Sequence, residues 1–313
     1  MKLYKPKFWD KKNSLYSILL YPLSLIVEFI IYIRKKFVKT LKFKIPIVCV
    51  GNIYIGGTGK TPLSILIAKE LLEEGKKPAI IRKYYKNHID EHNLIRNYFN
   101  NLILNKNRSE AIYDAQKNDF DIAILDDGFQ DYKVQKNLNI ICFNQNQLVG
   151  NGLIFPSGPL REKLSTLKNA QVVIINGNKD QNFEEKIFNI NKNIKIFYSK
   201  YKPINIDEFK NKKLLAVAGI GNPNNFFKLL DDNDLNIAKK IIYPDHYSFK
   251  KFEILEIINK AEKENYQIIM TEKDYFKISK YKFNKIKYLK VKLEIDNKKE
   301  LMRRILNVYN KNL

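Results

Sequence analysis

Short, continuously apolar runs recur along the chain and are separated by helical or loop segments. The runs are rich in β-branched residues, which is typical of strands buried on both faces of a parallel sheet. They are residues 45–50, 79–81, 121–125, 139–143, 171–175, 214–218 and 267–270. Because the chain shows no internal repeat, this alternation predicts an α/β fold with a parallel sheet covered by helices.

A glycine-rich turn follows the first run and leads into a predicted helix. The turn spans residues 51–61, and apolar residues then recur at helical spacing over 63–74. Pro62 suits the first turn of a helix, and Gly75 suits its C-terminal end. A Lys- and Asn-rich stretch at about 176–213 is the predicted domain junction.

The N-terminal 44 residues contain a long apolar segment between basic flanks. Leu15–Ile33 is interrupted by one charge, Glu28, and one proline, Pro22. Residues 1–44 carry 11 basic and two acidic side chains. A helix lying in a membrane interface fits this pattern best, with apolar side chains inserted and lysines facing anionic headgroups. A membrane span and a buried core helix are the alternatives.

Composition narrows the functional classes. The 313 residues are 45% hydrophobic and 28% charged, which argues against disorder, and the formal net charge of +23 favours polyanionic partners. Only seven of the 56 basic residues are arginine, so specific nucleic-acid binding is not expected. Two cysteines and three histidines make disulfide frameworks and histidine-built metal sites improbable and suit a reducing compartment.

The turn after the first run has the composition of a phosphate-binding loop. Gly56, Gly57 and Gly59 allow backbone N–H groups to turn inward, with Thr58 between them. Lys60 is placed to reach the β and γ phosphates, and the Thr61 hydroxyl to ligate Mg²⁺. Tyr54 stands where the strict motif has glycine, so the match is partial and an ordinary glycine-rich turn is the alternative.

A second chemical signal lies at the end of another apolar run. Residues 121–125 are followed directly by Asp126 and Asp127. A strand that ends in carboxylates is the form of an element that holds Mg²⁺ beside bound phosphates. A solvated turn is the alternative, but the glycine loop upstream favours the functional interpretation and a P-loop NTPase-like core.

At this point the chain resembles the tetraacyldisaccharide 4′-kinase family. The resemblance is carried by an ordered set of motifs across most of the chain. They are residues 50–53 with 56–62, Asp90-Glu91, Asp126–Gln130, Gly158–Glu162, Asp245–Phe249 and Thr271–Asp274. The glycine loop alone would be weak evidence, but the ordered set is specific.

The resemblance implies transfer of the γ-phosphate of ATP to the 4′-hydroxyl of a membrane-embedded glycolipid, a tetraacyldisaccharide 1-phosphate, to form lipid IVA in lipid A biosynthesis. It also implies Mg²⁺, the cytoplasmic face of the inner membrane and its anionic surface. Three parts are expected: a membrane-associated helix (1–44), a P-loop core (45–205) and a smaller C-terminal α/β domain that closes over the active site (206–313). We expect a monomer that does not bind nucleic acid.

Residue roles follow from the same resemblance. It assigns catalysis to Asp90, which would activate the sugar hydroxyl, to its partner His246, and to Asp127 and Lys60. Nucleotide-binding residues are 56–61, and metal ligands are Thr61, Asp126, Asp127 and Glu162. Substrate contacts fall to Asn52, Tyr84, Gln130 and Arg161.

The chain departs from the family pattern at several positions. Lys83 replaces a glycine, His92 replaces a proline, and Asp131 stands where histidine is common. The segment that joins Tyr84 to Asp90 is also short. Because Lys60, Thr61, Asp126, Asp127 and His246 are kept, the sequence is interpreted as that of a divergent but active kinase.

Two other functional classes are compatible with parts of the sequence. A GTPase-like switch would need a guanine-selective element, and the chain has none at the expected spacing. A basic scaffold for nucleic acid or lipid would bind polyanions without ATP, but it has no use for carboxylates beside a phosphate loop.

Overall fold

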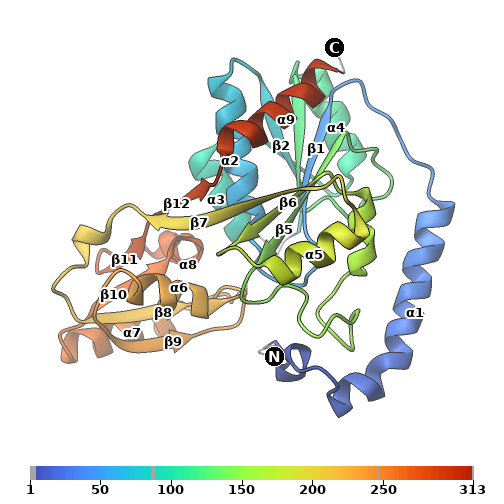
Figure 1. Cartoon of the computed structure of the whole chain (residues 1–313). Coiled ribbons are helices and arrows are strands. Elements are labelled where there is room, and N and C mark those ends of the chain that lie inside the picture. The colour runs from blue at the N-terminus through green and yellow to red at the C-terminus, as the bar shows by residue number, and fades with distance from the viewer. Residues whose placement is uncertain (1–4, 86–88, 246, 312–313) are drawn as a thin grey trace. The chain divides into compact units, whose positions relative to one another are not determined.

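The computed structural model describes residues 5–85, 89–245 and 247–311, except for the side chain of Asp90. The chain is an α/β protein that divides into two compact units (Figure 1). Within the described residues, the larger unit comprises 5–84, 99–200 and 295–311, and the smaller comprises 85–98 and 201–294.

The main sheet has eight strands, and the larger unit contributes most of their residues. Its strands, in spatial order, are β12 (Val291–Ile295), β7 (Lys195–Pro203), β6 (Val172–Asn176), β5 (Leu138–Asn144), β1 (Ile47–Gly51), β4 (Ile122–Asp126), β2 (Pro78–Lys83) and β3 (Leu102–Asn105). From β7 to β3 the pairs are parallel. Strands β5, β6 and β7 follow one another outward on one side of β1, whereas β2 and β3 lie on its other side, so the direction of the chain across the sheet reverses beside β1. Ligands of open parallel sheets bind at such a point, outside the carboxyl ends of the strands.

Helices cover this sheet, whose central strands are buried. The helices of the larger unit are α1 (Leu15–Phe37), α2 (Lys60–Glu73), α4 (Arg108–Lys117), α5 (Gln181–Ile190) and α9 (Lys298–Asn310), with 3₁₀ helices η1 (Lys7–Asp10) and η3 (Leu164–Asn169). On one face, Cys49, Ile81 and Leu125 of alternating strand positions join a core with Ala111 of α4 and Phe183 of α5. Helix α2 contacts β1, β2 and β4. The predicted helix over 63–74 thus begins three residues earlier, at Lys60.

The smaller unit has a parallel sheet of its own. Its strand order is β11 (Ile286–Leu289), β10 (Gln267–Thr271), β8 (Leu214–Ala218), β9 (Ile237–Ile242), and its helices are α3 (Ile89–Tyr98), α6 (Pro223–Asp231), α7 (Lys251–Lys263) and α8 (Glu272–Ile278), with 3₁₀ turns Ile206–Glu208 and Ser279–Tyr281. Met270 packs with Ile258 of α7 on one face, and Ile269 packs with Phe226 of α6 on the other.

The compact units differ from the predicted domain ranges at three segments. The N-terminal segment that includes α1 groups with the larger unit, as does α9, where Lys298 Nζ lies 2.6 Å from Glu70 Oε1 of α2. Residues 85 and 89–98 group with the smaller unit, because α3 packs along α8. These differences come from contacts between segments far apart in the sequence, which a linear pattern does not record.

Helix α1 contacts the rest of the larger unit through a few buried residues and is otherwise largely exposed. Ser17 and Ser24 are buried, whereas Leu19 and Phe29 are 68% and 63% exposed. The Ser24 hydroxyl donates to the Ile154 carbonyl at 2.8 Å. The most apolar 18-residue window of α1 has a mean hydropathy of 1.9, and in the part of the chain that the structure describes it is the one helix long and apolar enough to cross a membrane.

Candidate functional site

The glycine loop joins β1 to α2 at the carboxyl edge of the larger sheet. Gly59 caps the helix in a left-handed conformation (φ 88°), and Gly56 has φ 129°. Both values favour glycine, as the sequence predicted. A Cβ on Gly51 would lie 2.4 Å from the Cβ of Phe129, so the loop after β4 passes directly over the start of this turn.

Asn52 holds the loop together from inside. Its side chain is fully buried, and its amide nitrogen donates to the Tyr54 carbonyl at 2.7 Å, the Gly56 carbonyl at 3.3 Å and the Thr58 hydroxyl at 3.0 Å. In the other direction, the Gln130 amide donates to the Asn52 carbonyl at 2.8 Å. A buried asparagine with these bonds fixes the loop before any ligand binds.

Asp126, the last residue of β4, is fully buried in a polar cluster. Its carboxylate accepts hydrogen bonds from the hydroxyls of Thr61 at 3.0 Å and Ser64 at 3.1 Å. It also forms an ion pair with Arg82 of β2, which is itself 5% exposed and donates to the Thr61 hydroxyl at 3.3 Å. Asp126 therefore orients the Thr61 hydroxyl at the start of α2.

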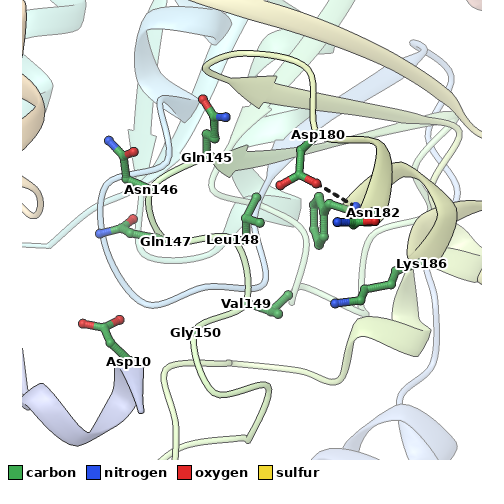
Figure 2. A pocket seen from close by; sticks show the side chains of 11 residues that line it. Asp10, Gln145, Asn146, Gln147, Leu148, Val149, Gly150, Asp180, Asn182 and Lys186 are labelled. Atoms are coloured by element: carbon green, nitrogen blue, oxygen red, sulfur yellow. Dashed lines mark hydrogen bonds between the residues drawn. The ribbon is translucent and has the colours of Figure 1, made fainter. Parts of the chain in front are cut away.

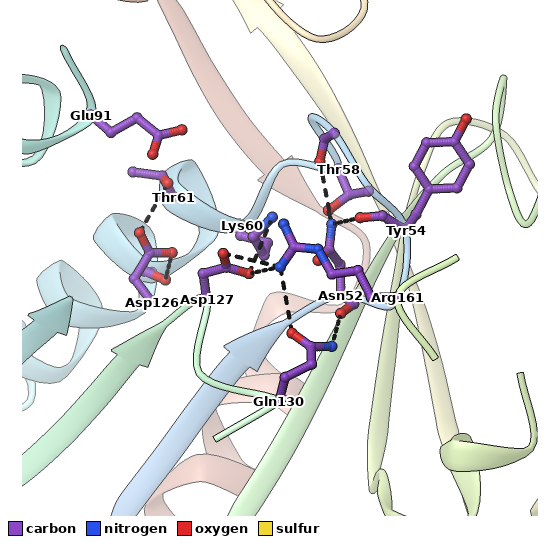
Figure 3. A network of polar contacts seen from close by, with 12 residues as sticks. Asn52, Tyr54, Thr58, Lys60, Thr61, Glu91, Asp126, Asp127, Gln130 and Arg161 are labelled. Carbon is purple, nitrogen blue, oxygen red and sulfur yellow. Dashed lines mark hydrogen bonds and ion pairs between the residues drawn. The ribbon is translucent and has the colours of Figure 1, made fainter. Parts of the chain in front are cut away.

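Asp127 follows in a left-handed conformation (φ 58°), which turns its side chain away from the strand's direction. Lys60 Nζ lies 3.6 Å from its carboxylate, and Arg161 donates to both carboxylate oxygens at 2.9 and 3.2 Å (Figure 3). Burial would raise the pKa of Asp127, but Lys60, Arg161 and further arginines hold that pKa well below its usual range.

Lys60 is the complement of this carboxylate. Its side chain is 11% exposed, and burial lowers the pKa of Lys60 although Asp127 opposes the effect. Because burying an unpaired charge costs free energy, a desolvated ammonium binds a nearby anion. In the structure the ammonium of Lys60 is paired with Asp127.

Arg161 links Asp127 to Gln130 and to the backbone of Ile53. Besides Asp127, its guanidinium lies 3.4 Å from the Gln130 amide oxygen, and its backbone N–H donates to the Ile53 carbonyl at 2.7 Å. The segments that carry Asn52, Asp127, Gln130 and Arg161 are thus joined in one network, as Figure 3 shows.

Glu162 is separate from the acid pair. It is 2% exposed, and its carboxylate lies 2.5 Å from Lys35 Nζ of α1. Burial, and next the Glu162 carboxylate, raise the pKa of Tyr132. Among the described residues, no three His, Cys, Asp or Glu side chains gather into a group that could hold a metal. The metal-ligand role of Glu162 stays a prediction; in the structure its carboxylate is paired with Lys35 of α1.

Three further predicted residues are Tyr84, Asp90 and His246. Tyr84 directly follows β2, and its side chain is 39% exposed. The backbone of Asp90 lies in α3, in the smaller unit, and its side chain is outside the description. His246 lies outside the described residues.

The structure adds three residues to the predicted site. Arg82 pairs with Asp126, Ser64 donates to the same carboxylate, and Arg108 Nη2 donates to the Asp127 carbonyl at 2.5 Å. The sequence signal for Ser64 was its position three residues after Thr61 on one helix face. Arg82 is brought opposite Asp126 only by the pairing of β2 with β4.

A separate cavity of about 390 Å³ lies beyond the ends of β5 and β6 (Figure 2). Its walls come from residues after β5, from the start of α5 and from η1: Gln145, Gln147, Asp180, Lys186 and Asp10 are among them. None of the residues predicted for the phosphate site lines it. Because Asp10, Asp180 and Lys186 give its lining charges of both signs, this cavity does not indicate a particular class of ligand.

Comparison with known proteins agrees with this geometry. The profile of the family described as Tetraacyldisaccharide-1-P 4'-kinase matches residues 16–310. The chain is 44% identical over its full length to the full-length tetraacyldisaccharide 4'-kinase of Pelagibacter ubique (strain HTCC1062). It is 33% identical to that of Francisella tularensis subsp. novicida (strain U112), over 93% of this chain and 99% of the relative.

A solved structure shares the fold. The crystal structure of LpxK from Aquifex aeolicus in complex with ATP superimposes with a TM-score of 0.74 and 23% identity. The superposition covers 94% of this chain and all of that one. The fold of this chain is thus a known one.

Proposed function

This chain belongs to the tetraacyldisaccharide-1-P 4'-kinase family, and on that premise we propose that it transfers the γ-phosphate of ATP to the 4′-hydroxyl of a tetraacyldisaccharide 1-phosphate. The product is lipid IVA, and the reaction is a step of lipid A biosynthesis. The observation that carries the proposal is the placement of Lys60 and Arg161 around Asp127, directly beside the glycine loop.

The glycine loop is proposed to bind the triphosphate. Backbone N–H groups of 56–61 and the start of α2 supply positive potential, and Lys60 supplies a mobile charge. When phosphate oxygens replace Asp127 as the partner of Lys60, the carboxylate remains paired with Arg161. Arg161 thus prevents Asp127 from repelling the incoming anion.

The oxygen ligands of Mg²⁺ are proposed to come from Thr61 and the acid pair. A hydroxyl and carboxylates are the hard oxygen donors that this ion prefers, so these side chains fit it. Asp126 already pairs with Arg82 and accepts from Thr61, which assigns it to orienting the Thr61 hydroxyl. When bound, the ion would neutralise charge on the transferring phosphate.

Asp90 and His246 are proposed to activate the acceptor, on the strength of their motifs. The Asp90 carboxylate takes the proton of the 4′-hydroxyl as that oxygen bonds to the γ-phosphorus and the bond to ADP breaks. His246 would hold that carboxylate. Gln130 and Arg161 lie on the loop side of the site, where substrate contacts are proposed together with Tyr84. The predicted role of Asn52 would be indirect, because its side chain is fully buried and holds the loop.

Helix α1 is proposed to lie in the cytoplasmic face of the inner membrane rather than to cross it. The larger unit holds the helix near both ends, through Asn151 to Ser17 at 3.1 Å and through Glu162 to Lys35 at 2.5 Å. These residues are 18 positions apart, or about 27 Å along a helix. Lipid therefore cannot surround the helix, whereas its exposed face can insert among acyl chains.

The test is transfer of ³²P from ATP to the purified glycolipid in detergent micelles. Lys60→Met removes the charge from the phosphate loop and is expected to lower kcat/KM at least 100-fold, an electrostatic effect of about 3 kcal/mol. Lys69→Met, on an exposed position of the same helix, is the matched control and should retain wild-type activity. Equal activity of both variants would overturn the assigned site.

A further inference from the structure

The motif Thr271–Asp274 has no part in the chemistry described so far. It lies where β10 ends and α8 begins, within the smaller unit. The Thr271 side chain caps α8 by accepting from the Asp274 N–H at 3.2 Å. Every residue of the motif then makes a side-chain contact within the same unit.

Asp274 anchors the start of α8 to the neighbouring strand. It is fully buried and accepts from the Gly219 N–H, just after β8, at 2.7 Å. Lys277 donates to Asp274 at 2.7 Å and to the Gly219 carbonyl at 3.0 Å. The first turn of α8 is therefore fixed to the carboxyl edge of the smaller sheet.

The two residues between these anchors reach outward to α3. Glu272 accepts from the Tyr98 hydroxyl at 2.5 Å, near the end of α3. Lys273 Nζ lies 3.2 Å from Glu91, near the start of α3, and 3.1 Å from Asp245. The side chains of Lys273 and Glu91 are 17% and 16% exposed, so this array of three charges is largely screened from water.

We propose that Lys273 is a positioning residue. Its ammonium holds together the two segments that carry Asp90 and His246, the residues proposed to activate the acceptor hydroxyl. The inference rests on the proposed function: Glu91 is the chain neighbour of Asp90, and Asp245 is the chain neighbour of His246. One ammonium joins their segments, and Asp274 fixes the helix that carries it. In this role Lys273 acts through Glu91 and Asp245.

The physical reason is geometric precision. A carboxylate can accept the hydroxyl proton only within hydrogen-bond reach, and a misplacement of about 1 Å costs on the order of 100-fold in rate. Without the ammonium, Glu91 and Asp245 would repel each other and move their segments apart. ATP binds the larger unit in the proposed function, so its affinity does not depend on this array.

The experiment compares Lys273→Met, Lys273→Arg and Lys285→Met in full-length protein. Lys285 is the matched control, an exposed lysine of the same unit paired with Glu262. In the glycolipid assay, Lys273→Met is expected to lower kcat about 10- to 100-fold with the KM for ATP changed less than about twofold. Arginine at position 273 should restore most of kcat, and Lys285→Met should match wild type.

Two further measurements separate positioning from general destabilisation. Because the pair acts as a unit, Lys273→Met combined with Glu91→Gln should lose no more activity than Lys273→Met alone. Amide exchange should become faster in α3 of Lys273→Met and stay unchanged in α2. Exchange in α3 equal to that of Lys285→Met, or a kcat equal to that control, overturns the inference.

The proposed function fails separately from this inference. A wild-type protein that transfers no phosphate to the glycolipid overturns the function. In that case the exchange measurement still decides whether Lys273 holds α3 in place.

Discussion

Arg82→Met is the sharpest test of the buried polar cluster behind the glycine loop. The substitution keeps a side chain of similar reach but leaves Asp126, which is fully buried, without its ion-pair partner. Breaking a buried pair in this way costs about 3–5 kcal/mol, because the remaining charge has no compensating neighbour. The Thr61 and Ser64 hydroxyls still donate to the carboxylate, which places the expected cost near the lower end, about 3 kcal/mol.

Urea unfolding followed by tryptophan fluorescence measures this cost. Trp9 is the only tryptophan and is buried in the larger unit, so its signal follows the unit that holds Arg82. Arg303→Met is the control, since that arginine is 71% exposed in its pair with Glu300 and should cost less than about 1 kcal/mol. If Arg82→Met costs no more than this control, Asp126 is not held by a buried ion pair.

Three other outcomes are expected. Asp127→Asn should have a lower free energy of unfolding than wild type at neutral pH. The difference should narrow as pH falls below about 4, because the stability that comes from a depressed carboxyl pKa is lost on protonation. A pH-independent difference in urea unfolding contradicts this. Phe29→Glu should weaken flotation with anionic vesicles at least tenfold, through loss of about 1.5–3 kcal/mol of burial, whereas Leu72→Glu on α2 should not. Gly51→Ala should lower the free energy of unfolding by about 1–3 kcal/mol, because its Cβ would clash with Phe129, and an unchanged thermal midpoint would refute that clash.

The central strands of both sheets could be predicted from sequence because they are apolar on both faces. β1, β4 and β8 are buried at every position, and each matches a continuous apolar run. β9 could not be found this way, since most of its residues are partly or fully exposed and lysines interrupt it. Its position follows from pairing with β8, which brings together segments about 20 residues apart.

Some residues of the candidate site could likewise be predicted from sequence, and others could not. Lys60, Asp126 and Asp127 were predictable, since each adjoins a strand end or a helix start with a local pattern. The roles of Arg82 and Arg108 were not, because their partners come from other strands and loops that meet only in the folded sheet. The grouping of α3 with α8 likewise depends on Lys273 and Glu272, whose partners are about 180 residues away.

The relation between ATP consumption and the lipid acceptor tests the central claim most directly. ADP formation should be measured with and without the tetraacyldisaccharide 1-phosphate, together with phosphate incorporation at the 4′ position. We predict that ADP forms only when the glycolipid is present, with one phosphate appearing on the lipid for each ADP. Rapid hydrolysis of ATP or GTP that is indifferent to the glycolipid would contradict the account.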